Sequence, residues 1–256
     1  MDKKSDHVKS VEKAADILLA FSEEKSQLSL MELSAKLKLP KSTVYRLLTT
    51  LESKGFVDQN GHNGKYQLGL KLLKISSVVL RNYRLKDVAL PVMTEMRDKI
   101  GETINLYVKR NLDRVCIEQV EGYHVLRRIS SIGDVLPLYC GASGKLLLAN
   151  EKDTEIERVI GSANIKMHTE NTIMDREVLL EELEKIKKQS FAFSRGEREN
   201  GVASVAAPIR NHEGAVIAAV SISGHDSRFF GESVQKYIKL VIAGANAISN
   251  NLGYTL

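Results

Sequence analysis

The chain has 256 residues, of which 43% are hydrophobic and 27% are charged, a composition typical of globular proteins with room for two cores. No apolar run reaches about 18 residues, and the charged N-terminus lacks the apolar segment of a secretory signal, so we expect a cytoplasmic protein without membrane spans. Two cysteines and six scattered histidines have no ligand spacing, and therefore neither a metal site nor another cofactor is expected.

Net charge is concentrated in the first third of the chain. The protein has 37 basic and 32 acidic side chains, and residues 1–83 hold 14 of the basic and 9 of the acidic ones, which accounts for the whole excess of five. Residues 84–256 are balanced. A polyanion is therefore expected to bind the N-terminal part, and the larger remainder is expected to have another task.

Two short helices are predicted near the N-terminus. Apolar residues at helical spacing indicate a helix over residues 10–21 and another over residues 29–37. Ser29 and Glu32 are three residues apart at the start of the second helix, the spacing of a capping box. These helices are the first parts of a predicted helix-turn-helix.

A third helix is predicted over residues 41–54, after Pro40, because its apolar residues repeat at the spacing that buries one side. Its other side is rich in hydroxyls, which suits hydrogen bonding to phosphates and base edges in a major groove. The alternative is an ordinary solvated helix. The candidate DNA-binding residues of this helix are Ser42, Thr43, Tyr45, Arg46 and Thr49.

A small β-hairpin follows, with strands near residues 56–57 and 65–68. The pairs Asn60-Gly61 and Asn63-Gly64 are expected to supply positive φ angles for tight turns between these strands. Such a wing lies along the DNA backbone or minor groove beside the recognition helix. Its candidate DNA contacts are His62, Asn63 and Lys65, and the alternative for them is a solvated loop tip.

Residues 69–84 are predicted to form a linker helix between domain 1–68 and domain 85–256. The helix has an apolar stripe that packs either on its own domain or on the same helix of a second chain. The members of the stripe are Leu72, Ile75, Val79, Leu80 and Tyr83. A DNA reader with a pseudo-palindromic site favours the dimer.

The C-terminal domain is predicted to be α+β, with strands in a mixed order and helices at both ends. Strands are expected at residues 103–108, 114–120, 127–132, 202–209 and 215–223. Helices are expected at residues 86–100, 146–149, 153–189 and 231–252.

Three motifs in this order resemble the IclR family of bacterial transcriptional regulators. They are Pro-Leu-Tyr-Cys-Gly-Ala-Ser-Gly-Lys at 137–145, Gly-Val-Ala-Ser-Val-Ala-Ala-Pro-Ile at 201–209 and Ala-Ala-Val-Ser-Ile-Ser-Gly at 218–224. The resemblance implies an N-terminal winged helix-turn-helix and a C-terminal GAF-like mixed-sheet effector domain. It also implies homodimers or tetramers, action on promoter DNA by repression or activation, and a small effector that often carries a carboxylate.

Family members bind their effector between the glycine loop and the last two strands. The resemblance thereby selects Leu136, Leu138, Gly141, Ala142, Ser143, Glu197, Ser204, Ser221 and Ser223. Backbone N–H groups near glycines, together with convergent hydroxyls, can satisfy a carboxylate. Strand alternation puts Ser221 and Ser223 on one face, although small serines also simply pack in strands. Some family members have Cys for Ser204 and Asp for Ser194, so the resemblance gives no ligand identity.

Two other functions deserve comparison. Gly141, Gly144 and Lys145 resemble part of a phosphate loop. However, the four residues that such a loop has between its glycines are missing, and so is the Ser or Thr that follows its Lys. An enzyme with a winged-helix interaction module remains the alternative to a regulator. It needs a nucleophile with its base, a metal cluster or a cofactor fingerprint, and no such set stands out.

Overall fold

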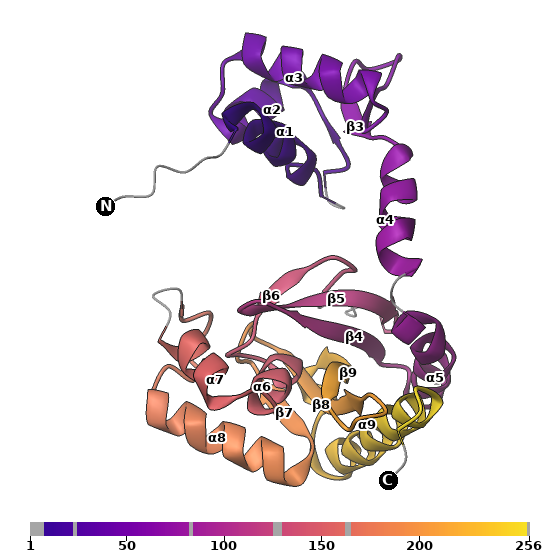
Figure 1. Ribbon diagram of the computed structural model, residues 1–256, viewed down its shortest axis with the longest axis vertical. Coiled ribbons are helices and arrows are strands. Elements are labelled where there is room, and N and C mark those ends of the chain that lie inside the picture. The colour runs from indigo at the N-terminus through magenta and orange to yellow at the C-terminus, as the bar shows by residue number, and fades with distance from the viewer. Residues whose placement is uncertain (1–7, 23–24, 82–83, 125–129, 162–164, 255–256) are drawn as a thin grey trace. The chain divides into compact units, whose positions relative to one another are not determined.

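The computed structural model (Figure 1) divides into two compact units, residues 1–83 and 84–256. The structure describes residues 8–22, 25–81, 84–124, 130–161 and 165–254. No helix among them is both long and apolar enough to cross a membrane.

The first unit is a winged helix-turn-helix, as predicted. Its elements are α1 (Lys9–Leu19), β1 (Gln27–Leu28), α2 (Leu30–Leu37), α3 (Lys41–Ser53), β2 (Val57–Gln59) and β3 (Tyr66–Leu68). The capping box of α2 is present: the Ser29 hydroxyl accepts from the Glu32 backbone N–H, and the Glu32 carboxylate accepts from the Ser29 N–H at 2.8 Å. Ile17, Leu33 and Leu48 are fully buried in the shared core of the three helices.

The wing contains one strand more than predicted and one positive φ fewer. Strand β1 pairs with β3, which gives the order β1-β3-β2, and two residues are too few to produce a detectable periodicity. At the tip, Asn60 N donates to Lys65 O at 2.8 Å, and Gly64 N donates to Asn60 O at 2.9 Å. Gly64 has φ +66°, but Gly61 is not among the glycines with positive φ. The expectation for Gly61 was therefore wrong, because one five-residue turn replaces two tight ones.

The linker helix is α4 (Lys71–Arg81). Of the predicted stripe, Leu72 is half-buried and Ile75 is 48% exposed, and the neighbouring Leu73 is 64% exposed. The remaining predicted stripe residues Val79, Leu80 and Tyr83 lie outside the described side chains. Part of the apolar surface of α4 is thus left uncovered by its own unit.

The second unit is built on a six-stranded sheet in the order β6-β5-β4-β9-β8-β7. Its strands are β4 (Thr103–Arg110), β5 (Asp113–Val120), β6 (Val135–Pro137), β7 (Ala192–Arg195), β8 (Val202–Arg210) and β9 (Val216–His225). Every strand pairing is antiparallel. The mixed sheet that the sequence predicted is therefore mixed in the order of its strands and not in their direction.

Helices cover both faces of this sheet (Figure 1). On one face lie α5 (Arg84–Ile100) and α9 (Gly231–Asn251), which pack on each other and on the sheet. On the other face α6 (Ala142–Ala149) packs on β7, β8 and β9, and α7 (Asp153–Ile160) and α8 (Arg176–Gln189) pack on α6. The short helix η1 (Asp226–Arg228) follows β9. Because both faces are covered, β9 is buried along most of its length.

Three expected elements need correction. Residues 130–132 of the strand expected at 127–132 form no strand, because a turn with Asp134 N bonded to Ser131 O precedes β6; residues 125–129 lie outside the described part. The helix expected over 153–189 is two helices, α7 and α8, separated by an irregular stretch. Strand β7 was not anticipated, and α6 begins at Ala142 rather than at 146.

Candidate functional site

Helix α3, which the sequence predicts to be the recognition helix, presents a polar face. Val44, Leu48 and Leu51 are buried on its inner side, which fixes the rotation of the helix. Ser42, Tyr45, Arg46 and Thr49 are exposed on the other side, and Thr43 is half-buried. The structure thus places these five predicted residues on or near one accessible surface.

Some candidate DNA contacts already have partners within the unit. The Thr49 hydroxyl donates to Tyr45 O at 3.0 Å. In the wing, the Asn63 side chain donates to Gln27 Oε1 at 3.0 Å and accepts from Lys65 N at 3.0 Å. Asn63 therefore stabilises the wing itself. His62 is exposed and Lys65 is half-buried.

In the second unit, a pocket opens on the α6 face of the sheet. Its lining residues are Tyr107, Arg114, Leu136, Gly141, Ser143, Ser194, Glu197, Arg198, Glu199, Val202, Ser204, Ser221 and Ser223. Leu138 and Ala142, also expected there, do not line the pocket and are buried in the hydrophobic core beneath α6. The cavity has a volume of about 30 Å³, room for one or two water molecules.

Sheet register explains why the serines converge. Ser194 is opposite Ser204, and Ser204 is opposite Ser223 across three adjacent strands. Directly opposed residues of an antiparallel pair share a face, so the three hydroxyls form a row. Ser221 is opposite Asn105 and lies two residues from Ser223 on the same face.

The hydroxyls of Ser204, Ser221 and Ser223 are available for hydrogen bonds to a ligand. Ser223 Oγ accepts from Asn105 Nδ2 at 2.7 Å, which leaves the Ser223 proton able to donate. In the described part of the chain, the hydroxyls of Ser204 and Ser221 have no hydrogen-bond partner. The pocket floor can therefore donate several hydrogen bonds to one small polar molecule.

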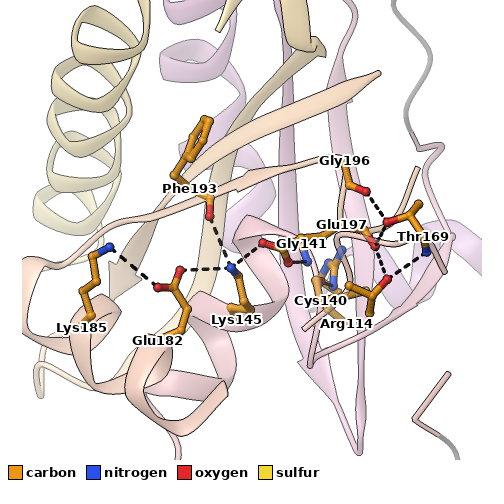
Figure 2. A network of polar contacts seen from close by, with 11 residues as sticks. Arg114, Cys140, Gly141, Lys145, Thr169, Glu182, Lys185, Phe193, Gly196 and Glu197 are labelled. Atoms are coloured by element: carbon orange, nitrogen blue, oxygen red, sulfur yellow. Dashed lines mark hydrogen bonds and ion pairs between the residues drawn. The ribbon is translucent and has the colours of Figure 1, made fainter. Parts of the chain in front are cut away.

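Behind the pocket, a buried ion pair holds the start of α6 (Figure 2). Lys145 Nζ is bound to Glu197 Oε1 at 2.6 Å and to Glu182 Oε1 at 3.1 Å, and the Lys145 residue is 1% exposed. Glu197 Oε2 accepts from Gly141 N at 2.9 Å. Both oxygens of Glu197 are thus occupied by groups of the protein.

The backbone of Glu197 is fixed as well. Thr172 Oγ1 donates to Glu197 O at 2.7 Å, and Thr169 Oγ1 donates to the same oxygen at 3.2 Å. Both threonines belong to the irregular stretch between α7 and α8 that the sequence had suggested to be helical. That stretch thereby positions a wall of the pocket.

Arg114 on β5 is a pocket residue that the sequence analysis missed. Its side chain is directed at the start of α6, where Nη1 donates to Pro137 O and, at 2.9 Å, to Cys140 O. Its guanidinium carbon lies 5.3 Å from the centroid of the Tyr107 ring. Burial lowers the pKa of Arg114. A signal was present, because Arg114 alternates with Cys116 on the side of β5 that proved to face inward.

Tyr107, Ser194 and Val202 were also missed. Arg198 and Glu199 belong to a charged run that the sequence allowed as a gate of the pocket, although a solvated surface was the favoured interpretation. Arg198 Nη2 lies 3.6 Å from Glu199 Oε2 at the edge of the pocket. Glu199 is exposed and Arg198 is half-buried, so these two residues are the lining residues nearest to solvent on this segment. Charged residues in a loop give no periodic signal that would reveal such a position.

Metal-binding clusters and reactive thiols are two kinds of group that enzyme chemistry can use. The described residues include no group of three His, Cys, Asp or Glu residues that could hold a metal ion. Burial raises the pKa of Cys116 to about 12, and burial also raises the pKa of Cys140. Both thiols are consequently protonated near neutral pH and are poor nucleophiles.

Comparison with known proteins gives matches over nearly the whole chain. The family model described as bacterial transcriptional regulator IclR C-terminal matches residues 77–250, and the IclR helix-turn-helix domain matches residues 10–61. The HTH-type transcriptional regulator KdgR of Escherichia coli (strain K12) is 36% identical over 254 residues, which are 99% of this chain and 96% of that protein.

Solved structures give the same result. The crystal structure of the Thermotoga maritima IclR has a TM-score of 0.81 and 34% sequence identity, with 97% of this chain and 100% of that chain covered. An IclR homolog from Microbacterium hydrocarbonoxydans, complexed with 4-hydroxybenzoate, shares the fold with a TM-score of 0.82 and 23% identity, over 95% of this chain and 98% of that chain.

Proposed function

Since the chain belongs to the IclR family of bacterial transcriptional regulators and is itself a helix-turn-helix regulator, we propose that a small carboxylate controls its binding to operator DNA. The family predicted from the three motifs is confirmed by these matches. The relatives named above are regulators and give no support to the enzyme alternative. Such a regulator acts where the bacterial chromosome lies, in the cytoplasm.

The convergence of donors in the pocket is the observation that supports a carboxylate effector. Ser204, Ser221 and Ser223 can donate hydrogen bonds from the sheet. Opposite them, Ser143 lies in the first turn of α6, where backbone N–H groups have no partner within the helix. Donors on two sides of a small cavity suit an anion with two oxygens.

An organic acid is larger than the present cavity of about 30 Å³, so binding requires a lining side chain to move. We expect Arg198 and Glu199 to move, because they lie between β7 and β8 rather than in a strand and Glu199 is exposed. The fixed floor would then recognise the carboxylate and the segment at its edge would adapt to the rest of the effector.

We propose that the DNA-bound form is a homodimer or a tetramer. In it, α3 of each DNA-bound chain reads one half of a pseudo-palindromic site. Ser42, Tyr45 and Arg46 would reach base edges and phosphates. The two half-sites must be met at a spacing of about 34–36 Å or its multiples. A modest change in the placement of the two winged helices is then enough to lose one set of contacts.

The test begins with a thermal-shift screen of small organic acids, including 4-hydroxybenzoate, because a ligand that binds only the folded state raises its stability. Operator affinity is then measured with and without the best acid. We expect a change of roughly 5- to 150-fold, the usual range of coupling between two sites. By linkage, operator DNA must change the affinity for the acid by the same factor.

The matched variants are the double substitution Ser221→Ala/Ser223→Ala in the pocket and Ser233→Ala on the exposed side of α9. The double variant should bind operator normally and lose its response to the acid, because its donors are removed. Ser233→Ala should respond like the unmodified protein. A double variant that still responds normally would place the effector elsewhere.

A further inference from the structure

One edge of the Arg114 guanidinium has no acceptor among the described residues. The Arg114 residue is 3% exposed, and Nη1 alone donates hydrogen bonds to described residues, to the carbonyls of Pro137 and Cys140. Nε is fully buried and has no hydrogen-bond partner. The Nε–H and one N–H of Nη2 point from the same edge of the group, the edge that binds a carboxylate side-on.

The described part of the chain supplies no carboxylate to this edge. Among the described residues, Arg114 has no acidic side chain within ion-pair distance. Glu197 also lines the pocket, but its two oxygens are bound to Lys145 Nζ and to Gly141 N, as Figure 2 shows. A buried polar group without a partner is unfavourable, and a buried charge more so. The edge therefore indicates a ligand that carries the missing acceptor.

Two glycines make the room that this arrangement needs. A Cβ added at Gly144 would overlap Arg114 Nη1, and one added at Gly141 would lie 3.0 Å from Nη2. Gly141 also has φ +76°, a conformation that other residues rarely adopt. The glycine loop that opens α6 is thus shaped around the guanidinium as well as around the pocket.

We propose that Arg114 recognises the negative charge of the effector by pairing side-on with its carboxylate through Nε and Nη2. This assignment rests on the proposed function of the pocket and adds the residue that selects acids over neutral molecules. A planar carboxylate matches the two parallel N–H groups. The free edge carries only two parallel N–H donors, which match the two oxygens of a carboxylate, so we favour the carboxylate and treat phosphate as the competing anion.

Formate tests this proposal without knowledge of the natural effector, because it is the smallest carboxylate and requires the least movement of the pocket lining. Formamide is its neutral counterpart of the same shape, and inorganic phosphate is the competing anion. Binding to the full-length protein is measured by titration calorimetry and thermal shift at constant ionic strength. We expect saturable binding of formate, no binding of formamide and weaker binding of phosphate.

The variants are Arg114→Gln, Arg114→Lys and the control Arg110→Gln, which changes an exposed arginine on β4 that does not line the pocket. Arg114→Gln should weaken formate binding by about 10- to 100-fold, the range expected for hydrogen bonds to a charged group. Arg114→Lys keeps the positive charge but lacks the two parallel N–H donors, so its loss of formate affinity should be smaller than that of Arg114→Gln. Arg110→Gln should bind formate normally.

A measurement on the unmodified protein covers the case in which the Arg114 variants fold poorly. The Nε–H resonance of Arg114, assigned by its absence from the spectrum of Arg114→Lys or by sequential methods, should shift with formate and not with formamide. An unchanged resonance, equal binding of formate to Arg114→Gln, or tighter binding of phosphate than of formate would overturn the proposal.

The two proposals fail in different ways. If formate binds at Arg114 but no organic acid changes operator affinity, the proposed regulation is wrong and the role of Arg114 as an anion site stands. If an acid changes operator affinity equally in Arg114→Gln and the unmodified protein, the regulation stands and Arg114 is not the charge-recognising residue.

Discussion

The two units of this protein carry polar side chains in opposite environments. On α3, Arg46 and its neighbours are exposed, and they come from one stretch of about two helical turns. In the effector unit, Arg114, Lys145 and Glu197 are buried and come from three distant segments. An exposed polar face needs no partner in the free protein, whereas a buried polar group needs one.

This difference predicts different consequences of substitution. A change on the exposed face should alter binding and leave the free energy of unfolding almost unchanged. A change in the buried network should alter the free energy of unfolding first, because a partner is left without compensation. Three substitutions test that contrast, in order of decreasing expected effect.

Lys145→Met should destabilise the effector unit by about 3–5 kcal/mol, since it leaves the buried Glu197 carboxylate without its cation. Calorimetric and urea unfolding of the full chain measure the effect. Lys99→Met is the matched control, because the Lys99–Glu95 pair has a similar N–O distance of 2.7 Å but is exposed, and it should lose only about 0.3–0.5 kcal/mol. Equal losses in both variants would refute the contrast.

Arg46→Ala should weaken operator binding by about 1–3 kcal/mol and relax the preference at one base pair of each half-site, if Arg46 reads a guanine. Its free energy of unfolding should change by less than about 0.5 kcal/mol, because the side chain is exposed. Lys65→Ala provides the comparison. If Lys65 contacts a phosphate, its loss should weaken binding to all DNA sequences alike and reduce the salt dependence of the affinity. Unchanged affinity and preference in Arg46→Ala would remove it from base readout.

Ile75→Asp should weaken self-association about tenfold if the exposed side of α4 contacts a second chain, because a charge would then be buried without a partner. Sedimentation velocity over a range of concentrations measures this, together with operator binding. Val178→Asp changes a similarly exposed apolar residue of α8 in the other unit, and it should have no effect on association. A fully dimeric Ile75→Asp that binds DNA normally would show that this part of α4 is not the interface.

Much of the first unit could be predicted from the sequence, because its signals are local. The spacing of Val44, Leu48 and Leu51 determines which side of α3 is buried, and therefore which side is exposed. The capping box at Ser29 and Glu32 requires only residues three positions apart. The third strand of the wing was missed, since a two-residue strand is defined by its partner β3 alone.

The lining of the pocket in the second unit was predicted in part, and its role as the effector site stays a prediction. Its serines were found by resemblance to a family and by the alternation of β9, and the structure adds the register that aligns Ser194, Ser204 and Ser223. Alternation says that Ser221 and Ser223 share a face, but it does not say which helix covers that face. The covering helix α6 was placed too late by four residues, because Gly141 and Gly144 weaken the helical pattern at its start.

By itself the sequence determined the winged helix, the polarity of α3 and the family, because periodicity and short motifs are properties of neighbouring residues. Only the tertiary structure decided that Arg114 faces the pocket with an unpaired edge and that Glu197 is already bound to Lys145, 52 positions away. Those facts depend on strand register and on which loops meet. A local pattern determines which side of an element is buried and leaves open what that side contacts.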